Sequence, residues 1–192
     1  MNILSIDDLS EKNKNPIKHT TTITFRLDSN ILQKLYDKAE RDDTSVNSIV
    51  NHILKRYIEW DMFENKSGMV PVSKPVVKDL FGRLSKEEVI DLSKEIAKNP
   101  VYEIALFMRG KVDPDSFISW FLSRMKTCSE ITSTNENGVS TFIFKHELGE
   151  NWSLYHKTVV ESIFNDFLHK PIDISITGST LVVKLENNRY QV

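Results

Sequence analysis

The sequence has few of the residues that build disulfide-linked, low-complexity or membrane-spanning proteins. Its single cysteine, Cys128, excludes a disulfide within the chain and fits a reduced cytoplasm. Glycine and proline occur only 6 times each, and there is no low-complexity tract or internal repeat. No apolar run is long enough to cross a bilayer, and a start that contains Asp7 and Asp8 is unlike a secretory signal. We therefore expect a globular cytoplasmic protein that does not bind membranes.

The sequence also lacks the short motifs that mark common enzyme classes. There is no glycine-rich phosphate loop, no Cys-x-x-Cys pair and no Gly-x-Ser-x-Gly elbow. The formal net charge is -2, which argues against a non-specific coat on nucleic acid but leaves room for a small basic face. We predict that the protein is not an enzyme and that it needs no cofactor.

Changes in composition and periodicity divide the chain into four parts. Residues 1–18 are a polar arm that we expect to be flexible, and residues 19–61 contain a short alternating run followed by two helical patterns. Residues 62–75 interrupt the helical pattern with one glycine and two prolines, which indicates a linker. Dense periodicity resumes over residues 76–192 and predicts a larger domain.

The alternating run that ends at Leu27 predicts a β-strand with one apolar and one polar face. The apolar side chains are Ile23, Phe25 and Leu27, and the polar side chains are Thr22, Thr24 and Arg26. A single strand is not stable in water, so this one needs a partner.

Two short amphipathic helices are predicted after this strand. Asp28 or Ser29 is suited to cap the first helix, Ser45 is suited to cap the second, and Asp42–Thr44 forms the break between them. About forty residues of this kind cannot bury their own apolar surface. Antiparallel pairing of the strand with its copy in a second chain would complete the ladder and close a shared core. We therefore expect an obligate homodimer, and the sequence leaves open whether dimers associate into tetramers.

The order strand, helix, turn, helix over roughly Thr20–Trp60 resembles the ribbon–helix–helix repressors of the Arc/MetJ/CopG type. The stretches TITFRLD and TSVNSIV are the basis of the resemblance. It implies a dimeric, mainly α domain with β-α-α order, whose two-stranded ribbon enters the major groove of double-stranded DNA. The turn departs from the family, which often has glycine where this chain has Asp42 and Asp43. Two carboxylates there would repel a DNA backbone unless they point away from it.

The resemblance also assigns DNA-contacting residues. Base edges would be contacted by Thr22, Thr24 and Arg26, and a phosphate by the start of the second helix at Ser45, Val46 and Asn47. Arginine can donate two hydrogen bonds to guanine, threonine can donate or accept at base edges, and a helix N-terminus attracts phosphate. Lys18 in the preceding arm is expected to add a salt-dependent phosphate contact.

In residues 76–192, helix boundaries are indicated by local capping signals. Ser85 opens a capping box, and Asp113-Pro114 is suited to the start of another helix. Asn99-Pro100 predicts a helix end, because proline disfavours a helical residue before it.

Two hairpins are predicted in the same part of the chain. Asn137-Gly138 and Gly178 each lie between two alternating runs, and a long helix is predicted between the hairpins at residues 151–169. The expected fold is an α+β sandwich with a mostly antiparallel four-stranded sheet that folds by itself. We recognise no family in this part.

Three histidines and two glutamates in the C-terminal part are candidate metal ligands. They are His146, His156, His169, Glu147 and Glu150. No two of the histidines have the i, i+4 spacing that directs two imidazoles at one ion from a helix, so we predict no metal site and interpret them as hairpin-end and helix-surface residues. Cys128 is interpreted as a small buried apolar residue, with redox sensing as the alternative.

These features predict a homodimeric, sequence-specific DNA-binding transcription regulator whose C-terminal domain senses an effector or mediates oligomerisation. One alternative is an antitoxin-like autoregulator whose C-terminal region binds a toxin protein, although such regions are usually short and disordered before binding. Another is an enzyme with its site in the C-terminal domain, which the lack of a recognisable catalytic constellation disfavours. The sequence specifies neither the operator, nor the effector, nor whether the regulator activates or represses.

Overall fold

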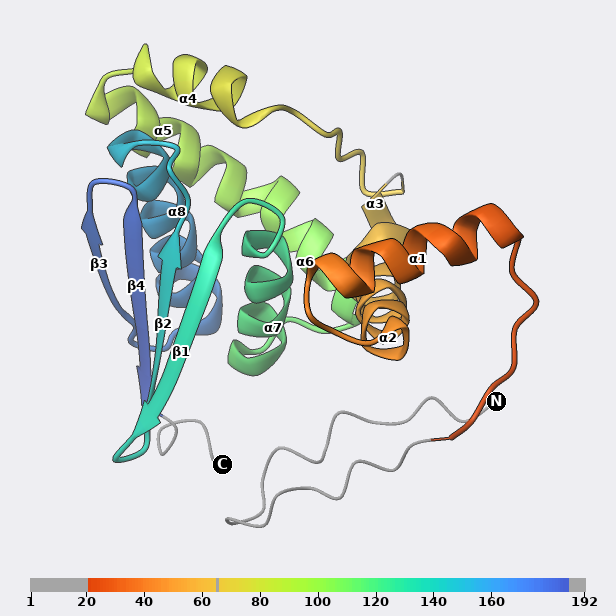
Figure 1. The fold of residues 1–192 in the computed structure, drawn as a ribbon. Coiled ribbons are helices and arrows are strands. Elements are labelled where there is room, and N and C mark those ends of the chain that lie inside the picture. Colours follow the sequence, from red (N-terminus) through yellow and green to blue (C-terminus); the bar gives the residue numbers. More distant parts are fainter. Residues whose placement is uncertain (1–20, 65, 187–192) are drawn as a thin grey trace. The chain divides into compact units, whose positions relative to one another are not determined.

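The chain is organised as two compact units. The computed structural model describes residues 21–64 and 66–186 (Figure 1). The first unit ends at Val50 and the second begins at Asn51, so that the division falls inside one continuous helix, α2 (Val46–Arg56). None of the helices in these two ranges is both long enough and apolar enough to cross a bilayer.

The described part of the first unit consists of an irregular segment, one complete helix and the start of another. Helix α1 spans Ser29–Arg41 and is capped by Asp28, whose carboxylate accepts a hydrogen bond from the Asn30 N–H at 2.8 Å. Helix α2 is capped by Ser45, whose hydroxyl accepts one from the Ser48 N–H at 3.0 Å. Both caps satisfy N–H groups that have no partner inside a helix, and the sequence predicted both.

The β-strand predicted at residues 22–27 is wrong. Residues 21–28 form neither helix nor strand, and the first strand of the described residues begins at Glu130. The physical reason is that a ladder needs a second backbone to pair its N–H and C=O groups, and no strand of the described chain offers one here. The N-terminal part is therefore an irregular segment followed by helices, and the predicted β-α-α ribbon fold does not describe it.

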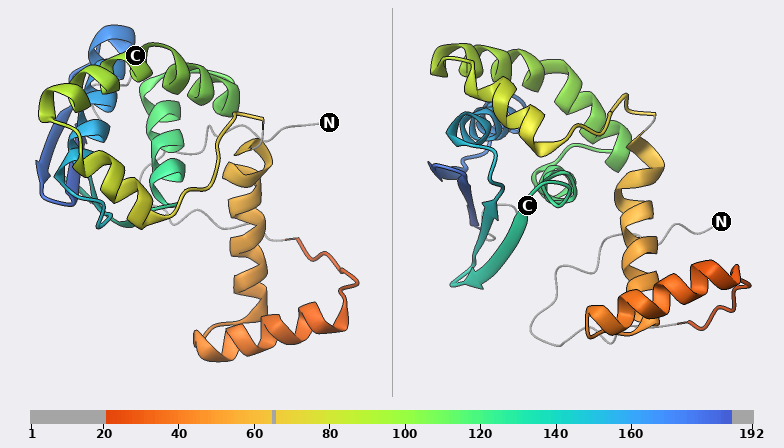
Figure 2. Two further views of the ribbon diagram at one scale, coloured as in Figure 1. Left: turned by 90° about the horizontal axis from the view of Figure 1, so that it is seen from above. Right: turned by 45° about the horizontal axis from the view of Figure 1, so that its top comes forward.

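In the second unit, helices cover one face of a four-stranded sheet (Figures 1 and 2). Three of the helical stretches, labelled η, are π-helical turns, which are wider than α-helix. The helical elements after α2 are η2 (Tyr57–Asp61), α3 (Met62–Glu64), α4 (Lys74–Gly82), α5 (Lys86–Ile96), η3 (Ala97–Val101), α6 (Tyr102–Arg109), α7 (Pro114–Met125), α8 (Glu150–Ser162) and η4 (Ile163–Leu168).

The helix end predicted at Asn99-Pro100 is also wrong. Helices α5 and α6 are joined through η3, and Pro100 lies inside this π-helical turn. Proline has no N–H to donate, and in an α-helix its ring clashes with the carbonyl one turn earlier. The wider turn changes which carbonyl lies above the ring, and helical backbone therefore continues past Pro100.

The sheet is built from the two predicted hairpins. Its strands are β1 (Glu130–Glu136), β2 (Val139–Lys145), β3 (Asp173–Thr177) and β4 (Thr180–Glu186), in the order β1-β2-β4-β3 with every neighbouring pair antiparallel. Asn137 and Gly138 connect β1 to β2 with φ of 53° and 76°. Positive φ at both residues is what a tight two-residue hairpin turn requires, and Asn-Gly supplies it with the least strain.

The core of the second unit lies between the sheet and the helices that cover it. Its largest fully buried rings are Phe117 and Phe121 of α7, Phe144 of β2 and Phe164 of η4. They meet edge to face, with ring centroids 5.3 Å apart for Phe121 and Phe144 and 6.0 Å apart for Phe117 and Phe164. Trp60 of η2 belongs to the same core, so the second unit buries apolar residues that precede the predicted linker.

Candidate functional site

The side chains predicted to contact DNA bases lie on a fully exposed segment. Thr22, Thr24 and Arg26 are exposed, and within the described part of the chain the guanidinium of Arg26 forms no hydrogen bond or ion pair. The apolar residues that alternate with them are Ile23, Phe25 and Leu27, with exposed fractions of 67%, 57% and 46%. The structure thus places both sets of side chains at the surface, where large apolar groups are normally few.

The turn between α1 and α2 shows how the two aspartates are accommodated. Asp42 ends α1 and its carboxylate is ion-paired with the Lys38 ammonium at 2.6 Å. Asp43 adopts a φ of 48°, the left-handed conformation for which this position often has glycine in the family named above. The ion pair partly offsets one of the two negative charges, which reduces the repulsion that a nearby phosphate would meet.

The phosphate-contacting residues predicted at the start of α2 lie at the exposed N-terminal end of that helix. Ser45 serves as the cap, and Val46 and Asn47 form the first turn. A helix of this length presents partial positive charge at its first turn, which suits an anion. Lys18, the remaining predicted contact, lies outside the described residues.

The helices that follow the irregular segment also expose large apolar side chains. They are Ile31 and Tyr36 on α1, Ile53 and Leu54 on α2, and Tyr57 and Ile58 on η2. A surface helix normally turns its apolar side chains towards a core. Ile31 and Tyr36 belong to the first unit and the other four residues to the second, so each unit by itself exposes large apolar groups of the kind that a partner can cover.

In the second unit, His146 lies at the end of β2 and is held in a buried network. Its Nδ1 accepts a hydrogen bond from the Leu148 N–H at 3.0 Å, so Nε2 is protonated and donates to the Ser153 hydroxyl at 2.8 Å. That hydroxyl donates to the Gly178 carbonyl at 2.7 Å. Burial, and to a lesser extent the charge of Lys74, lowers the pKa of His146 to about 4. The ring therefore ties β2, α8 and the β3–β4 turn together as a neutral imidazole.

His156 is buried among aromatic rings of α7 and α8. Its Nδ1 donates to the Trp152 carbonyl at 3.0 Å, and its ring centroid lies 4.6 Å from that of Trp152 and 4.9 Å from that of Tyr155. Burial, followed by the positive charge of Arg124, lowers the pKa of His156 to about 3. Both histidines act as packing groups in these positions, and the hydrogen-bonding and ring partners named here lie within seven residues of them in the sequence. The interpretation of His156 as a helix-surface residue is wrong, because its ring is buried.

The remaining candidates do not join these two. His169 is exposed at the end of η4, where its Nδ1 bonds the Asn165 carbonyl at 3.0 Å. Over residues 21–64 and 66–186, no three His, Cys, Asp or Glu side chains are grouped closely enough to hold one metal ion. Cys128 is half-buried, with its sulfur 3.6 Å from the Ser129 hydroxyl.

A concave surface of about 280 Å³ lies where α2 leads into η2 and faces the end of α7. It contains several cations, and two of them are directed at one carboxylate. Lys55 and Lys126 lie 3.6 and 3.7 Å from Glu59, whose backbone carbonyl also faces Arg109 at 3.4 Å. The two lysine side chains are 67% and 56% exposed, so each of these ion pairs stabilises the second unit by at most about 1 kcal/mol.

No family model matches the chain. No curated protein and no solved structure matches it either.

Proposed function

We propose that the chain is a cytoplasmic, homodimeric, sequence-specific DNA-binding transcription regulator that is not an enzyme. The observation on which this rests is the exposed segment 21–28, in which threonine and arginine side chains alternate with large apolar ones directly before two short helices. Within the described part of the chain, Ile23, Phe25 and Leu27 are not buried, and the guanidinium of Arg26 forms no hydrogen bond or ion pair. The sequence resemblance to ribbon–helix–helix repressors supports the same assignment, although the strand of that family is not formed.

A second copy of the chain is the proposed cover for the apolar side chains. Burying one large apolar side chain stabilises an assembly by about 1.5–3 kcal/mol. Association costs roughly 4–15 kcal/mol in lost freedom of motion, so several such side chains must be buried together. Ile23, Phe25 and Leu27, with Ile31 and Tyr36 of α1, supply that number from the first unit of each chain. A two-fold dimer would bring two copies of the DNA-reading segment together.

The proposed DNA contacts separate into two classes. Arg26, with Thr22 and Thr24, would contact base edges and determine sequence preference. The N-terminal end of α2, at Ser45, Val46 and Asn47, would contact a phosphate and set the orientation of the protein on the duplex. The folded second unit is proposed to sense an effector or to extend the assembly, which would alter the relative placement of the two reading segments.

The proposal is tested by selecting bound sites from random-sequence DNA with the full chain and measuring affinity for selected and unselected duplexes. Arg26→Ala should lower the ratio of these affinities by about 5- to 150-fold, the factor for 1–3 kcal/mol of base discrimination. Arg83→Ala is the matched control, because Arg83 is an exposed arginine whose ion pair with Asp79 lies in α4. It removes the same charge and should leave the ratio unchanged.

Two results would contradict the proposal. Selection that enriches no sequence would exclude a sequence-specific reader, and an unchanged ratio in Arg26→Ala would exclude Arg26 from base reading. Purification from the native host distinguishes a regulator from an antitoxin. A small protein that co-purifies in stoichiometric amount would favour the antitoxin alternative. Sedimentation of the pure protein reports whether it is a dimer.

A further inference from the structure

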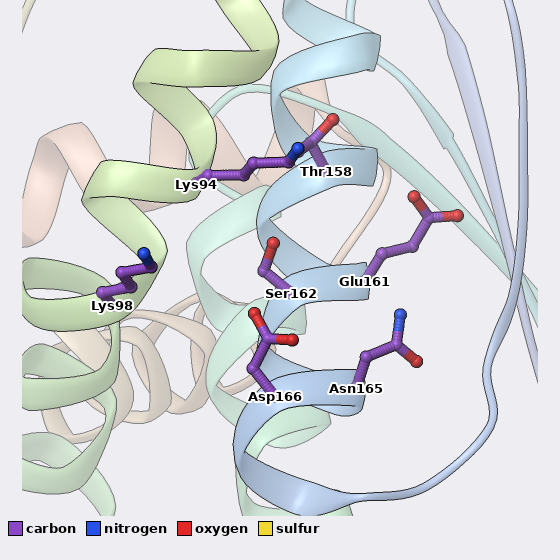
Figure 3. A pocket seen from close by; sticks show the side chains of 7 residues that line it. All are labelled: Lys94, Lys98, Thr158, Glu161, Ser162, Asn165 and Asp166. Carbon is purple, nitrogen blue, oxygen red and sulfur yellow. The ribbon is translucent and has the colours of Figure 1, made fainter.

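A polar groove of about 420 Å³ lies between α5 and α8, away from the surfaces described so far (Figure 3). One wall contains Lys94 of α5 and Lys98 of η3. The other wall and the floor are formed by Thr158, Glu161, Ser162, Asn165 and Asp166 of α8 and η4. The volume falls in the range of small-molecule sites, which is about 300–1,000 Å³.

The two walls present opposite charges that do not meet. Lys94 extends from α5 towards α8, and Ser162 and Asp166 point into the space that faces the lysines (Figure 3). Within the described residues, Lys94, Lys98 and Asp166 form no ion pair, whereas Glu161 is paired with Lys157 at 3.5 Å. The groove therefore offers two ammonium groups on one side and one unpaired carboxylate on the other.

The floor of the groove provides neutral hydrogen-bonding groups on a fixed scaffold. Thr158 and Ser162 are buried one turn apart on α8. Opposite them, Ser93 and Ala97 are fully buried, which keeps α5 and α8 closely packed. Close packing of α5 on α8 keeps the backbone positions that carry the charged side chains at a fixed separation, which favours a preorganised site.

π-Helical turns contribute residues to both walls. Lys98 belongs to η3, and Asn165 and Asp166 belong to η4. Such turns are rare and occur often at functional sites, because they shift a side chain away from the position that a regular α-helix would give it. The η3 turn accommodates Pro100, whereas η4 contains no proline, so η4 is the second observation, independent of charge, that points to a ligand.

We propose that this groove binds a free α-amino acid. The ammonium groups of Lys94 and Lys98 bind the carboxylate of the ligand, and the carboxylate of Asp166 binds its ammonium group. The hydroxyls of Thr158 and Ser162 form hydrogen bonds with polar atoms of the ligand. A simple anion would meet the negative charge of Asp166, and a simple cation would meet the two lysines, so the groove favours a molecule that has both charges. This goes beyond DNA binding and stands without it, because binding is measured in the absence of DNA.

The experiment is a thermal-shift and calorimetric screen of the full chain against the standard free α-amino acids at millimolar concentration. Each amino acid that binds is then compared with its N-acetyl derivative, which lacks the ammonium, and with its amide, which lacks the carboxylate. Both derivatives should bind at least about tenfold more weakly, since each loses one charge-assisted interaction.

Paired variants test the residues. Lys94→Met and Asp166→Asn should each weaken binding by about 10- to 100-fold, the factor for one hydrogen bond to a charged group. The matched controls are Lys78→Met on α4 and Asp91→Asn on α5, which remove the same charges from exposed positions outside the groove and should leave the affinity unchanged. All four positions are exposed, so the variants are expected to fold, and circular dichroism verifies this.

Three results would overturn the proposal. One is that no free amino acid in the panel binds, and another is that an N-acetyl derivative binds as tightly as its parent. The third is that Lys94→Met and Asp166→Asn bind as tightly as the two controls.

Discussion

The two units of the chain differ in what happens to their apolar side chains. In the second unit, Phe117, Phe121, Phe144 and Phe164 are almost completely buried against one another and against the sheet. In the described part of the first unit, Ala39 is the only apolar residue in the buried class. The second unit therefore encloses a core of large apolar side chains, although it also exposes others such as Phe107, whereas no large apolar side chain in the described part of the first unit is buried.

This difference indicates that the second unit folds by itself, whereas the first unit depends on a partner for the burial of its apolar side chains. A closed core stabilises a single chain at any protein concentration, whereas exposed apolar groups are stabilised only when another surface covers them. The second unit contains its own core, and the first unit is the region where we propose that a second copy binds. Five predictions follow from the comparison; four are substitutions, which run from the largest expected effect to the smallest, and one is a pH series.

The largest effect is expected from Phe117→Ala in α7. Removing a fully buried phenylalanine loses its transfer free energy and leaves a cavity, so the free energy of unfolding should fall by about 3–5 kcal/mol. Phe107→Ala is the control, because Phe107 is an exposed phenylalanine on α6, and its change should stay below about 1 kcal/mol. Urea unfolding of both variants measures the difference, and equal losses would show that the second unit has no dominant core.

The next effect is expected from Ile31→Glu on α1. Ile31 is 53% exposed in the single chain, so the substitution should barely change the stability of an isolated chain. In a dimer it would bury a charge, and the dissociation constant should rise by roughly 30-fold or more, the factor for a loss of about 2 kcal/mol. Val72→Glu changes an equally exposed residue outside α1 and α2 and should leave the dimer intact. Sedimentation at several protein concentrations measures the dissociation constant of the dimer for both variants. Equal masses for the two variants would contradict the proposed surface.

The local parts of the fold could be predicted from sequence. The caps at Ser85 and Asp113 and the turn at Asn137-Gly138 each depend on residues within three positions of one another, so the signal is contained in a short stretch. The four-stranded antiparallel sheet followed from the two hairpins.

The features that depend on distant partners could not be predicted. Alternation at residues 22–27 reports which side chains are apolar but supplies no second strand, and a helix continues past Pro100 because a wider turn replaces the expected break. The groove is lined by both Lys94 and Asp166, which are far apart in sequence. They line the same groove only because α5 packs on α8. The assignments of Thr22, Thr24 and Arg26 to DNA bases stay predictions, which only binding experiments can test.

Acid should destabilise the second unit through its two buried histidines. Their pKa values fall from 6.5 to about 4 for His146 and about 3 for His156, so below pH 6.5 the unfolded chain binds protons that the folded chain does not. Stability is fully present above pH 6.5 and decreases as the pH falls towards 4, by at most about 1.4 kcal/mol per pH unit for each histidine. Urea unfolding at a series of pH values measures the slope. His146→Gln should reduce that slope, and an unchanged slope would show that His146 is not buried as a neutral ring.

A smaller effect, about 1 kcal/mol, is expected from Ser85→Ala at the start of α5. The Ser85 hydroxyl accepts from the Glu88 N–H, and the Glu88 carboxylate accepts in return from the Ser85 N–H at 2.7 Å. Ser73→Ala is the matched control, because Ser73 precedes α4 in the same position but its side chain forms no capping hydrogen bond. Thermal unfolding should lower the melting temperature for Ser85→Ala alone, and equal shifts would exclude a specific role for the capping box.

The smallest effect is expected in the first unit, at the turn between α1 and α2. Asp43 has a φ of 48°, which strains a residue with a Cβ, so Asp43→Gly should relieve strain while making the unfolded chain more flexible. The two terms oppose each other, and the net gain should be about 0.5 kcal/mol. Asp42→Gly is the matched control: Asp42 has a φ of -95° and is paired with Lys38, so there the substitution should destabilise. Amide exchange along α1 and α2 measures both variants locally. Stabilisation by Asp42→Gly but not by Asp43→Gly would mean that this turn is not held in the left-handed conformation, and that the first unit is less ordered as a single chain than its two caps imply.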